Sequence, residues 1–185
     1  MRILLLSLCV FLTACPGPAL QTRGQYPAEI TGVGDSKNFP LSAAGYTRGK
    51  IYTYEPGMRN HSIAYDVFGP QLQNAVTLFF YKVPAPLAEQ FLAEKNQIVA
   101  SHPGATLVRE APVTFQKSGV TYQGYAATYT FQAVFAQREQ LVSSQLILVE
   151  HPARYVKVRS TAPSIQGALA EAGTRQLMEE VNWAY

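Results

Sequence analysis

Histidines and carboxylates are the first residues in this 185-residue chain whose chemistry can be tested by spacing. The three histidines, His61, His102 and His151, lie in different segments, each beside turn-forming residues. A zinc site needs three or four ligands that converge on one point, and these histidines lack any short ligand spacing. Paired carboxylates perform glycoside hydrolysis, but Glu139 and Glu150 occupy strand ends, where charges are usually solvated. We therefore expect exposed histidines, no metal site and no bound cofactor.

The tripeptide Gly34-Asp35-Ser36 resembles the start of the GDS-type esterase block. Such an enzyme needs an aspartate and a histidine late in the chain to activate the serine. Asp35 and Asp66 are the only aspartates, and no Asp-x-x-His sequence follows. We therefore expect an ordinary loop turn here, and no catalytic residue anywhere in the chain.

Aromatic and basic side chains are the remaining candidates for binding. The tyrosines that fall in expected strands are Tyr52, Tyr54, Tyr65, Tyr81, Tyr122, Tyr125, Tyr129 and Tyr155. A row of tyrosines on a sheet can stack sugars or grip a peptide, although tyrosine also favours strands for packing reasons alone. Arg154, Lys157 and Arg159 form a basic stretch that is either a binding edge for an anionic lipid or polymer or, as we expect, a solvated face.

Alternation of apolar residues predicts the strands that must position these side chains. The expected strands are 46–54, 61–68, 75–83, 107–116, 120–132, 140–150 and 155–161, with turns at 117–119 and 151–154. A helix is expected from about 84 to 101, because Leu87, Phe91 and Ile98 recur at helical spacing before His102-Pro103-Gly104. A second helix is expected from 163 to 183, with a kink or break near Gly173 left open.

This order predicts an α+β domain: a mainly antiparallel sheet of about six to seven strands with two packed helices, arranged like an αβα sandwich. We expect a single domain over residues 43–185. Residues 15–42 contain frequent proline and glycine and are expected to form a flexible tether, unless part of the segment packs as an irregular edge strand.

The first 14 residues have the pattern of an export signal. Arg2 precedes an apolar run over residues 3–12, which is too short to span a bilayer as a helix. The sequence Leu12-Thr13-Ala14-Cys15 follows and resembles the lipobox of bacterial lipoproteins. The resemblance implies cleavage between Ala14 and Cys15, and lipidation of the Cys15 thiol with a diacylglyceryl group and a further fatty acid such as palmitate.

Processing at Cys15 would leave no free thiol, because Cys9 is removed with the signal peptide. The mature chain would carry 14 basic and 12 acidic residues without a basic cluster, so we expect no nucleic-acid partner. Pro16 stands where the inner-membrane retention signal has aspartate. In a host with two membranes we therefore expect attachment to the outer membrane, facing the periplasm.

Two stretches of the domain resemble the Mog1/PsbP-like fold, which is found in many small envelope lipoproteins. They are Gly45–Gly49 with Tyr54 ahead of Ser62–Tyr65, and Arg154–Arg159 leading to Pro163. The resemblance covers about residues 42–185 and implies a binding domain, since the family offers no catalytic set to transfer. We expect a non-enzymatic envelope lipoprotein that binds or scaffolds another envelope protein or polymer. The alternatives are a hydrolase of envelope polymers and a carrier of a lipid or other apolar ligand.

Overall fold

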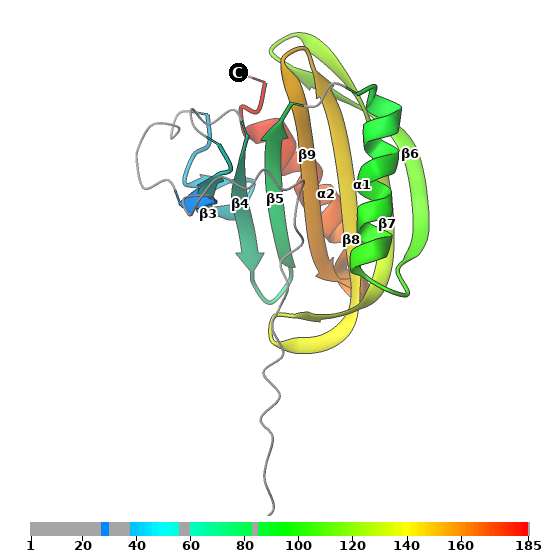
Figure 1. Ribbon diagram of the computed structural model, residues 1–185. Helices are drawn as coiled ribbons and strands as arrows, with labels where there is room; N and C mark the ends of the chain where they lie inside the picture. Colours follow the sequence, from blue (N-terminus) through cyan, green and yellow to red (C-terminus); the bar gives the residue numbers. More distant parts are fainter. Residues whose placement is uncertain (1–26, 30–37, 56–59, 83–84, 185) are drawn as a thin grey trace, which may run out of the picture.

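The computed structural model describes residues 27–29, 38–55, 60–82 and 85–184, which form one twisted sheet with a helix on each face (Figure 1). The strand order is β1-β3-β4-β5-β9-β8-β7-β6, with β2 also paired to β3, and every neighbouring pair is antiparallel. The expected α+β class is confirmed. The expected count of six to seven strands is wrong: the sheet has nine among the described residues.

The strands expected from alternation are all present, and the last four extend by one to three residues beyond their expected bounds. The strands are β1 Ala28–Glu29, β2 Ser42–Ala43, β3 Tyr46–Thr53, β4 His61–Phe68, β5 Gln73–Tyr81, β6 Thr106–Lys117, β7 Val120–Phe135, β8 Arg138–His151 and β9 Arg154–Pro163. The two additional strands are β1 and β2, which are two residues long and therefore too short to produce an alternating pattern.

Helix α1, Leu87–Ser101, begins directly after Pro86. His102 is its C-cap residue, and Gly104, with a φ of +87°, follows in the turn. A 3-10 turn at Ser164–Gln166 leads into α2, Gly167–Glu180, which is continuous through Gly173. The expected helix over 163–183 is therefore shorter at its end. Trp183, beyond α2, is fully buried and donates its indole N–H to the Met178 carbonyl at 2.7 Å.

The two faces of the sheet hold two separate clusters of apolar side chains. Residues of α1, such as Phe91 and Ile98, pack with Leu146 and Leu148 of β8 on one face, which we call the α1 face. Leu177 and Met178 of α2 pack with Ile147 and Val149 of the same strand on the opposite face, the α2 face. Strand β8 is buried on both faces where it lies under both helices, which explains its apolar run over residues 146–149.

The segment that was expected to be a tether packs on the domain in its described parts and adds two short strands to the sheet. Ala28 lies opposite Thr53 in the register of β1 and β3. Phe39 is fully buried, and its ring lies 5.3 Å from that of Phe80. The Tyr65 hydroxyl donates to the Pro40 carbonyl at 2.8 Å. The edge strand that we had left open as an alternative is therefore present as β1 and β2.

Antiparallel pairing gives the sheet two distinct ends, which differ in the turns that they carry. The upper end, as drawn in Figure 1, holds the β6–β7 and β8–β9 turns and the entry to α1. The lower end holds the β4–β5 and β7–β8 turns and the passage from β9 into α2. These two ends are compared below as candidate surfaces.

Candidate functional site

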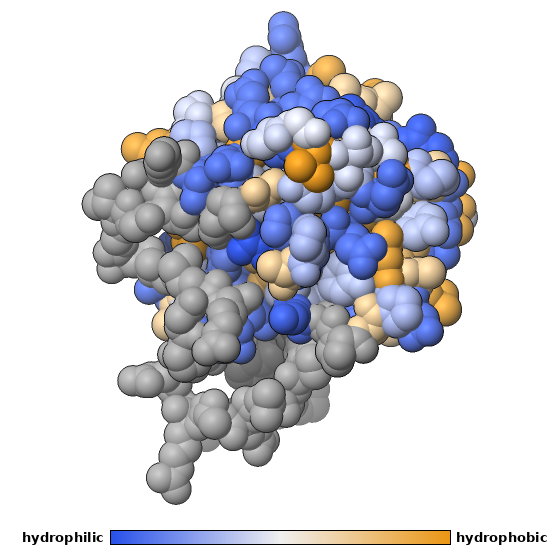
Figure 2. Space-filling model, turned by 90° about the horizontal axis from the view of Figure 1, so that it is seen from above, coloured by the Kyte–Doolittle hydropathy of each residue, from blue (hydrophilic) through white to orange (hydrophobic). Residues whose placement is uncertain are grey.

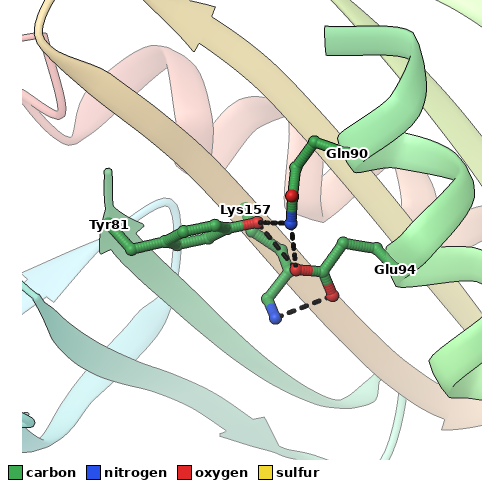
Figure 3. A network of polar contacts seen from close by, with 4 residues as sticks. All are labelled: Tyr81, Gln90, Glu94 and Lys157. Atoms are coloured by element: carbon green, nitrogen blue, oxygen red, sulfur yellow. Dashed lines mark hydrogen bonds and ion pairs between the residues drawn. The ribbon is translucent and has the colours of Figure 1, made fainter. Parts of the chain in front are cut away.

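A network of ionisable side chains joins α1 to the centre of the sheet (Figure 3). The Tyr81 hydroxyl on β5 donates to Glu94 Oε1 at 2.7 Å. The Gln90 amide donates to the same oxygen at 3.1 Å and lies 3.2 Å from the Tyr81 hydroxyl. Lys157 on β9 donates to Glu94 Oε2 at 2.9 Å. Both carboxylate oxygens of Glu94 are therefore occupied.

Burial reduces the screening of charges within this network. The Glu94 side chain is only 8% exposed and that of Lys157 only 16%, so the ion pair has little screening from solvent. The Lys157 ammonium also lies 4.6 Å from the centre of the Phe79 ring. Burial first, and the adjacent Glu94 carboxylate second, raise the pKa of Tyr81 far above its ordinary value. Tyr81 therefore remains a hydrogen-bond donor throughout the physiological range.

The network positions α1, since its members come from α1, β5 and β9 and are bonded to one another. Sequence reasoning did not find this network. The available signal was weak: Gln90 and Glu94 are four residues apart on the helix, which puts both on one face. Nothing in the sequence shows that this face is turned toward the sheet at Tyr81 and Lys157.

A second network, without formal charge, lies beneath α2. Asn74 on β5 donates to the Tyr46 hydroxyl at 2.8 Å and to Thr174 Oγ1 at 3.1 Å, and accepts a hydrogen bond from Ser160 at 2.8 Å. All four side chains are buried. A Cβ atom at Gly173 would lie 2.6 Å from the Tyr46 hydroxyl, so glycine at this helix position is required by close packing.

The expected basic face of Arg154, Lys157 and Arg159 is wrong, because β9 is an interior strand between β5 and β8. Lys157 and Arg159 point to the α1 face, where Arg159 donates to Ser144 Oγ at 3.1 Å. Arg154 points to the α2 face, lies over the Phe80 ring and donates to the Trp183 carbonyl at 3.3 Å. The three side chains therefore form neither a shared binding edge nor a solvated face.

The histidines are not simple exposed turn residues, since each stacks on an aromatic ring. His61 is buried and lies 4.6 Å from the centre of the Phe80 ring. His102 stacks on Phe131 at 4.1 Å, and His151 stacks on Tyr122 at 5.5 Å. Burial lowers the pKa of His102, with a smaller contribution from Arg159, and burial together with Arg154 lowers the pKa of His151.

The tyrosines are divided between the two faces and form no single row among the described strands. Tyr125, Tyr129 and Tyr155 belong to the cluster under α1, whereas Tyr65 and Tyr122 belong to the cluster under α2. Gly34-Asp35-Ser36 and the processing site Ala14–Cys15 lie outside the described residues. Within the described ranges, no group of three His, Cys, Asp or Glu side chains is placed to hold a metal ion.

A groove at the lower end runs between the start of α2 and strands β6, β7 and β8, with a volume of about 340 Å³. Its polar lining includes the hydroxyl residues Thr128, Thr130, Ser143 and Ser164. Glu171 of α2 also lines it, accepting from Thr128 at 2.8 Å and forming an ion pair with Arg109. A Cβ atom at Gly167 would lie 3.0 Å from the Ser143 side chain, so this glycine allows α2 to begin close to the sheet.

Val108 is the exposed large apolar residue that lines this groove, and other exposed apolar side chains lie at the lower end on both faces of the sheet. Val108 lines the groove and is 61% exposed, Ile165 in the 3-10 turn is 95% exposed, and Leu169 is in the first turn of α2. Further exposed apolar residues at this end are Phe68, Leu107, Val134 and Leu141. Phe68 lies 6.0 Å from Phe135 between ring centres, which brings the end of β4 beside the β7–β8 turn. We call this surface the apolar lower end.

The upper end has the opposite character. Seen from above in Figure 2, it is mostly hydrophilic, with the apolar residues scattered over it. Tyr54 and Val120 are its exposed large apolar residues among those described. A shallow pocket of about 210 Å³ lies beside the β8–β9 turn and includes the charged residues Lys82, Glu150 and Arg154.

Together these observations define an α+β domain that carries a small, partly apolar surface groove and internally bonded charged groups. No family model matches the chain, and no curated protein matches it. Among solved structures, it is similar to a Pseudomonas aeruginosa protein of unknown function, PA94. The identity is 12% and the TM-score 0.52, over 72% of this chain and 94% of that one. This likeness concerns the fold alone. No helix in the described residues is long and apolar enough to cross a membrane.

Proposed function

We propose that the chain is a bacterial lipoprotein, anchored through Cys15 to the outer membrane and facing the periplasm, whose domain binds another envelope component. The support for the anchor is the sequence: the charged start, the short apolar run, and the lipobox Leu12-Thr13-Ala14-Cys15. Pro16 supports the outer membrane as the destination. The resemblance to the Mog1/PsbP-like fold stays a prediction.

The groove at the apolar lower end is the observation that carries the binding role. Exposed apolar side chains that gather around a groove commonly mark interaction sites in water-soluble domains. Val108 illustrates the point, because it lines the groove and is 61% exposed, so most of its apolar surface is not buried in the folded domain. Burial of such exposed apolar surface against a partner would contribute hydrophobic free energy to binding.

Neither alternative function gains a specific observation. A hydrolase of envelope polymers would need a free carboxylate or an activated nucleophile in a cleft. In the lower-end groove, the Glu171 carboxylate is bound by Arg109 and Thr128. A carrier would need an apolar space between helix and sheet, and the described residues fill those layers with two clusters of apolar side chains.

Metabolic labelling with palmitate tests the anchor. The wild-type chain should incorporate the label and fractionate with the outer membrane, whereas Cys15→Ser should not incorporate it, because the acceptor thiol is gone. Cys9→Ser is the matched control and should label normally, since Cys9 lies within the predicted signal peptide. Label in the Cys15→Ser variant would contradict the proposed anchor, and recovery of the wild type in the inner membrane alone would contradict the proposed location.

Recovery of a stoichiometric partner from solubilised membranes tests the binding role. Val108→Asp should abolish the recovery, because it places a charge in the exposed apolar part of the groove lining. Val120→Asp changes an exposed apolar residue at the upper end and should leave the recovery intact. Absence of any partner after cross-linking in intact cells would count against the proposal, and so would equal losses in the two variants.

A further inference from the structure

The two edges of the sheet differ in how far the chain itself covers them. At one edge, β1 and β2 pair with opposite ends of β3, and a register shift between Arg48 and Ile51 interrupts β3 between them. At the other edge, β6 pairs with β7 alone, and no strand of the described ranges lies beyond it (Figure 1). The free N–H and C=O groups of such an edge can pair with a strand of another molecule.

The β6–β7 turn determines which backbone groups of β6 are free. Lys117 lies opposite Val120, and Ser118 and Gly119 between them have φ of 51° and 78°, as in a two-residue type I′ hairpin. The two residues that flank such a turn are hydrogen-bonded to each other, so Lys117 directs its backbone groups toward β7. Because this direction alternates along a strand, the residues that direct theirs outward are Glu110, Pro112, Thr114 and Gln116.

Pro112 therefore interrupts the free edge near its middle. Proline has no N–H to donate, and its ring occupies the place of the missing hydrogen. In an outward-facing position this costs β6 no hydrogen bond to β7, but a strand laid along the edge would lose a bond and meet the ring. The edge is left with residues 113–117 and residues 106–111, and the second stretch contains a register shift between Leu107 and Arg109.

The sequence around Pro112 would otherwise favour pairing between molecules. Residues 111–116 carry no charge, and Val113, Thr114 and Phe115 are β-forming residue types. Short, uncharged segments of this kind on an exposed edge are typical sites of intermolecular strand pairing, provided that they contain no proline. A second copy of the chain offers the same segment, and two β6 edges can pair antiparallel about a twofold axis.

We infer that Pro112 prevents β6 from pairing with β6 of a second copy, and that it keeps the domain from joining its sheet to that of another molecule. The inference goes beyond the proposed binding role, because it concerns a surface that the fold closes to association. It depends only on described residues of β6 and β7, so it stands apart from the lipid anchor and from the groove.

Pro112→Val tests the inference on the full chain in detergent, by sedimentation velocity over a range of protein concentrations. The variant has the missing N–H and a β-branched side chain, so its protein mass should rise reversibly with concentration from one copy to two. The amides of Glu110 and Thr114 should then exchange hydrogen more slowly than in the wild type. A variant that stays monomeric would overturn the inference. So would a variant that melts well below the wild type, because the proline would then serve the fold itself.

Two control variants show whether association follows the free edge. Thr114→Val adds apolar surface to the same strand but keeps Pro112, and it should remain monomeric. The double variant Pro112→Val with Thr114→Pro moves the proline to the next outward-facing position and should also be monomeric. Association of Thr114→Val would assign the effect to hydrophobicity, and association of the double variant would place the contact elsewhere. Either result would overturn the inference.

The direction of the backbone groups has a test of its own in the monomeric chain. Thr114→Pro should melt close to the wild-type temperature, because the N–H that it removes faces outward. Val113→Pro should melt at a clearly lower temperature, because residue 113 bonds to β7 opposite Gly124. Equal losses, or a larger loss for Thr114→Pro, would show that the outward-facing positions are assigned wrongly and would overturn the role of Pro112.

Discussion

The two buried polar networks hold two helices to opposite faces of one sheet, and they do so by different means. Beneath α1, Glu94 and Lys157 form an ion pair that is completed by Tyr81 and Gln90. Beneath α2, Asn74, Tyr46, Thr174 and Ser160 exchange hydrogen bonds between neutral groups. The first depends on charge and the second on close packing around Gly173.

The difference indicates how each helix interface should fail. A buried ion pair is weak evidence for net stabilisation, but removal of one partner leaves the other charge unpaired in a poorly solvated site. A neutral network has no stranded charge, yet its members fit so closely that an added methyl group forces them apart. The α1 interface should therefore be sensitive to unbalanced charge, and the α2 interface to added volume.

Glu94→Ala should have the largest effect on stability. It leaves the Lys157 ammonium without its carboxylate and the Tyr81 hydroxyl without its acceptor. We expect a loss of about 3–5 kcal/mol in the free energy of unfolding, measured by urea denaturation. Glu89→Ala, on the exposed side of α1, is the control and should cost about 0.5 kcal/mol or less. Equal losses in the two variants would show that the network does not stabilise the domain.

Gly173→Ala should be the next most damaging change. It should lower the free energy of unfolding by about 1–3 kcal/mol, because the added methyl group overpacks against Tyr46. The effect should shrink or change sign in a Tyr46→Phe background. Without the hydroxyl, the nearest remaining ring atoms lie 3.5 Å from the new methyl group, and alanine favours the helix. The four unfolding free energies form a double-mutant cycle. Simple additivity in that cycle would refute the proposed contact.

The double variant Glu94→Gln with Lys157→Met tests whether charge balance matters more than the ion pair itself. Its free energy of unfolding should differ from that of the wild type by about 1.5 kcal/mol or less, because no charge is left unpaired and the apolar stem of residue 157 is kept. Each single variant should be less stable than the double variant. A double variant that is as unstable as the sum of its single changes would assign a direct stabilising role to the ion pair.

The smallest expected effect concerns pH and involves one histidine on each face. The pKa values of His102 and His151 lie below the ordinary value of about 6.5, so the unfolded chain binds protons that the folded chain does not. Their contribution to stability is complete above pH 6.5 and falls as the pH decreases through the folded pKa. His102→Gln and His151→Gln should each reduce the loss of melting temperature between pH 7 and pH 5. An unchanged loss in both variants would contradict the assignment.

The sequence predicted what depends on local pattern. The strand His61–Phe68 was expected with its observed bounds, because alternation over eight residues is a strong signal. Helix α1 was also expected, from the spacing of Phe91 and Ile98. The basic face of Arg154, Lys157 and Arg159 was placed wrongly, because the position of β9 inside the sheet depends on its pairing with the distant β5.

The candidate groove was not predicted, and the reason is physical. Val108, Thr130, Ser143 and Gly167 come from four separate elements and converge only when α2 packs across β6, β7 and β8. Each of these residue types is ordinary where it stands, so no local signal distinguishes it. The exposure of Ile165 was also hidden, since an apolar residue near the start of a helix normally predicts a buried stripe.

The place of β9 between β5 and β8 also determines when the two parts of the sheet can join during folding. Strands β6, β7 and β8 are joined by short turns and can pair as soon as they exist, but β5 waits for β9, about 80 residues later in the chain. Until then, the N-terminal strands have no hydrogen-bonded neighbour that connects them to the remaining sheet. A chain truncated before residue 154 would therefore contain two unconnected sheets with exposed edges, which are prone to aggregation. Nascent chains of this protein therefore depend on β9 to join the two parts into a single sheet.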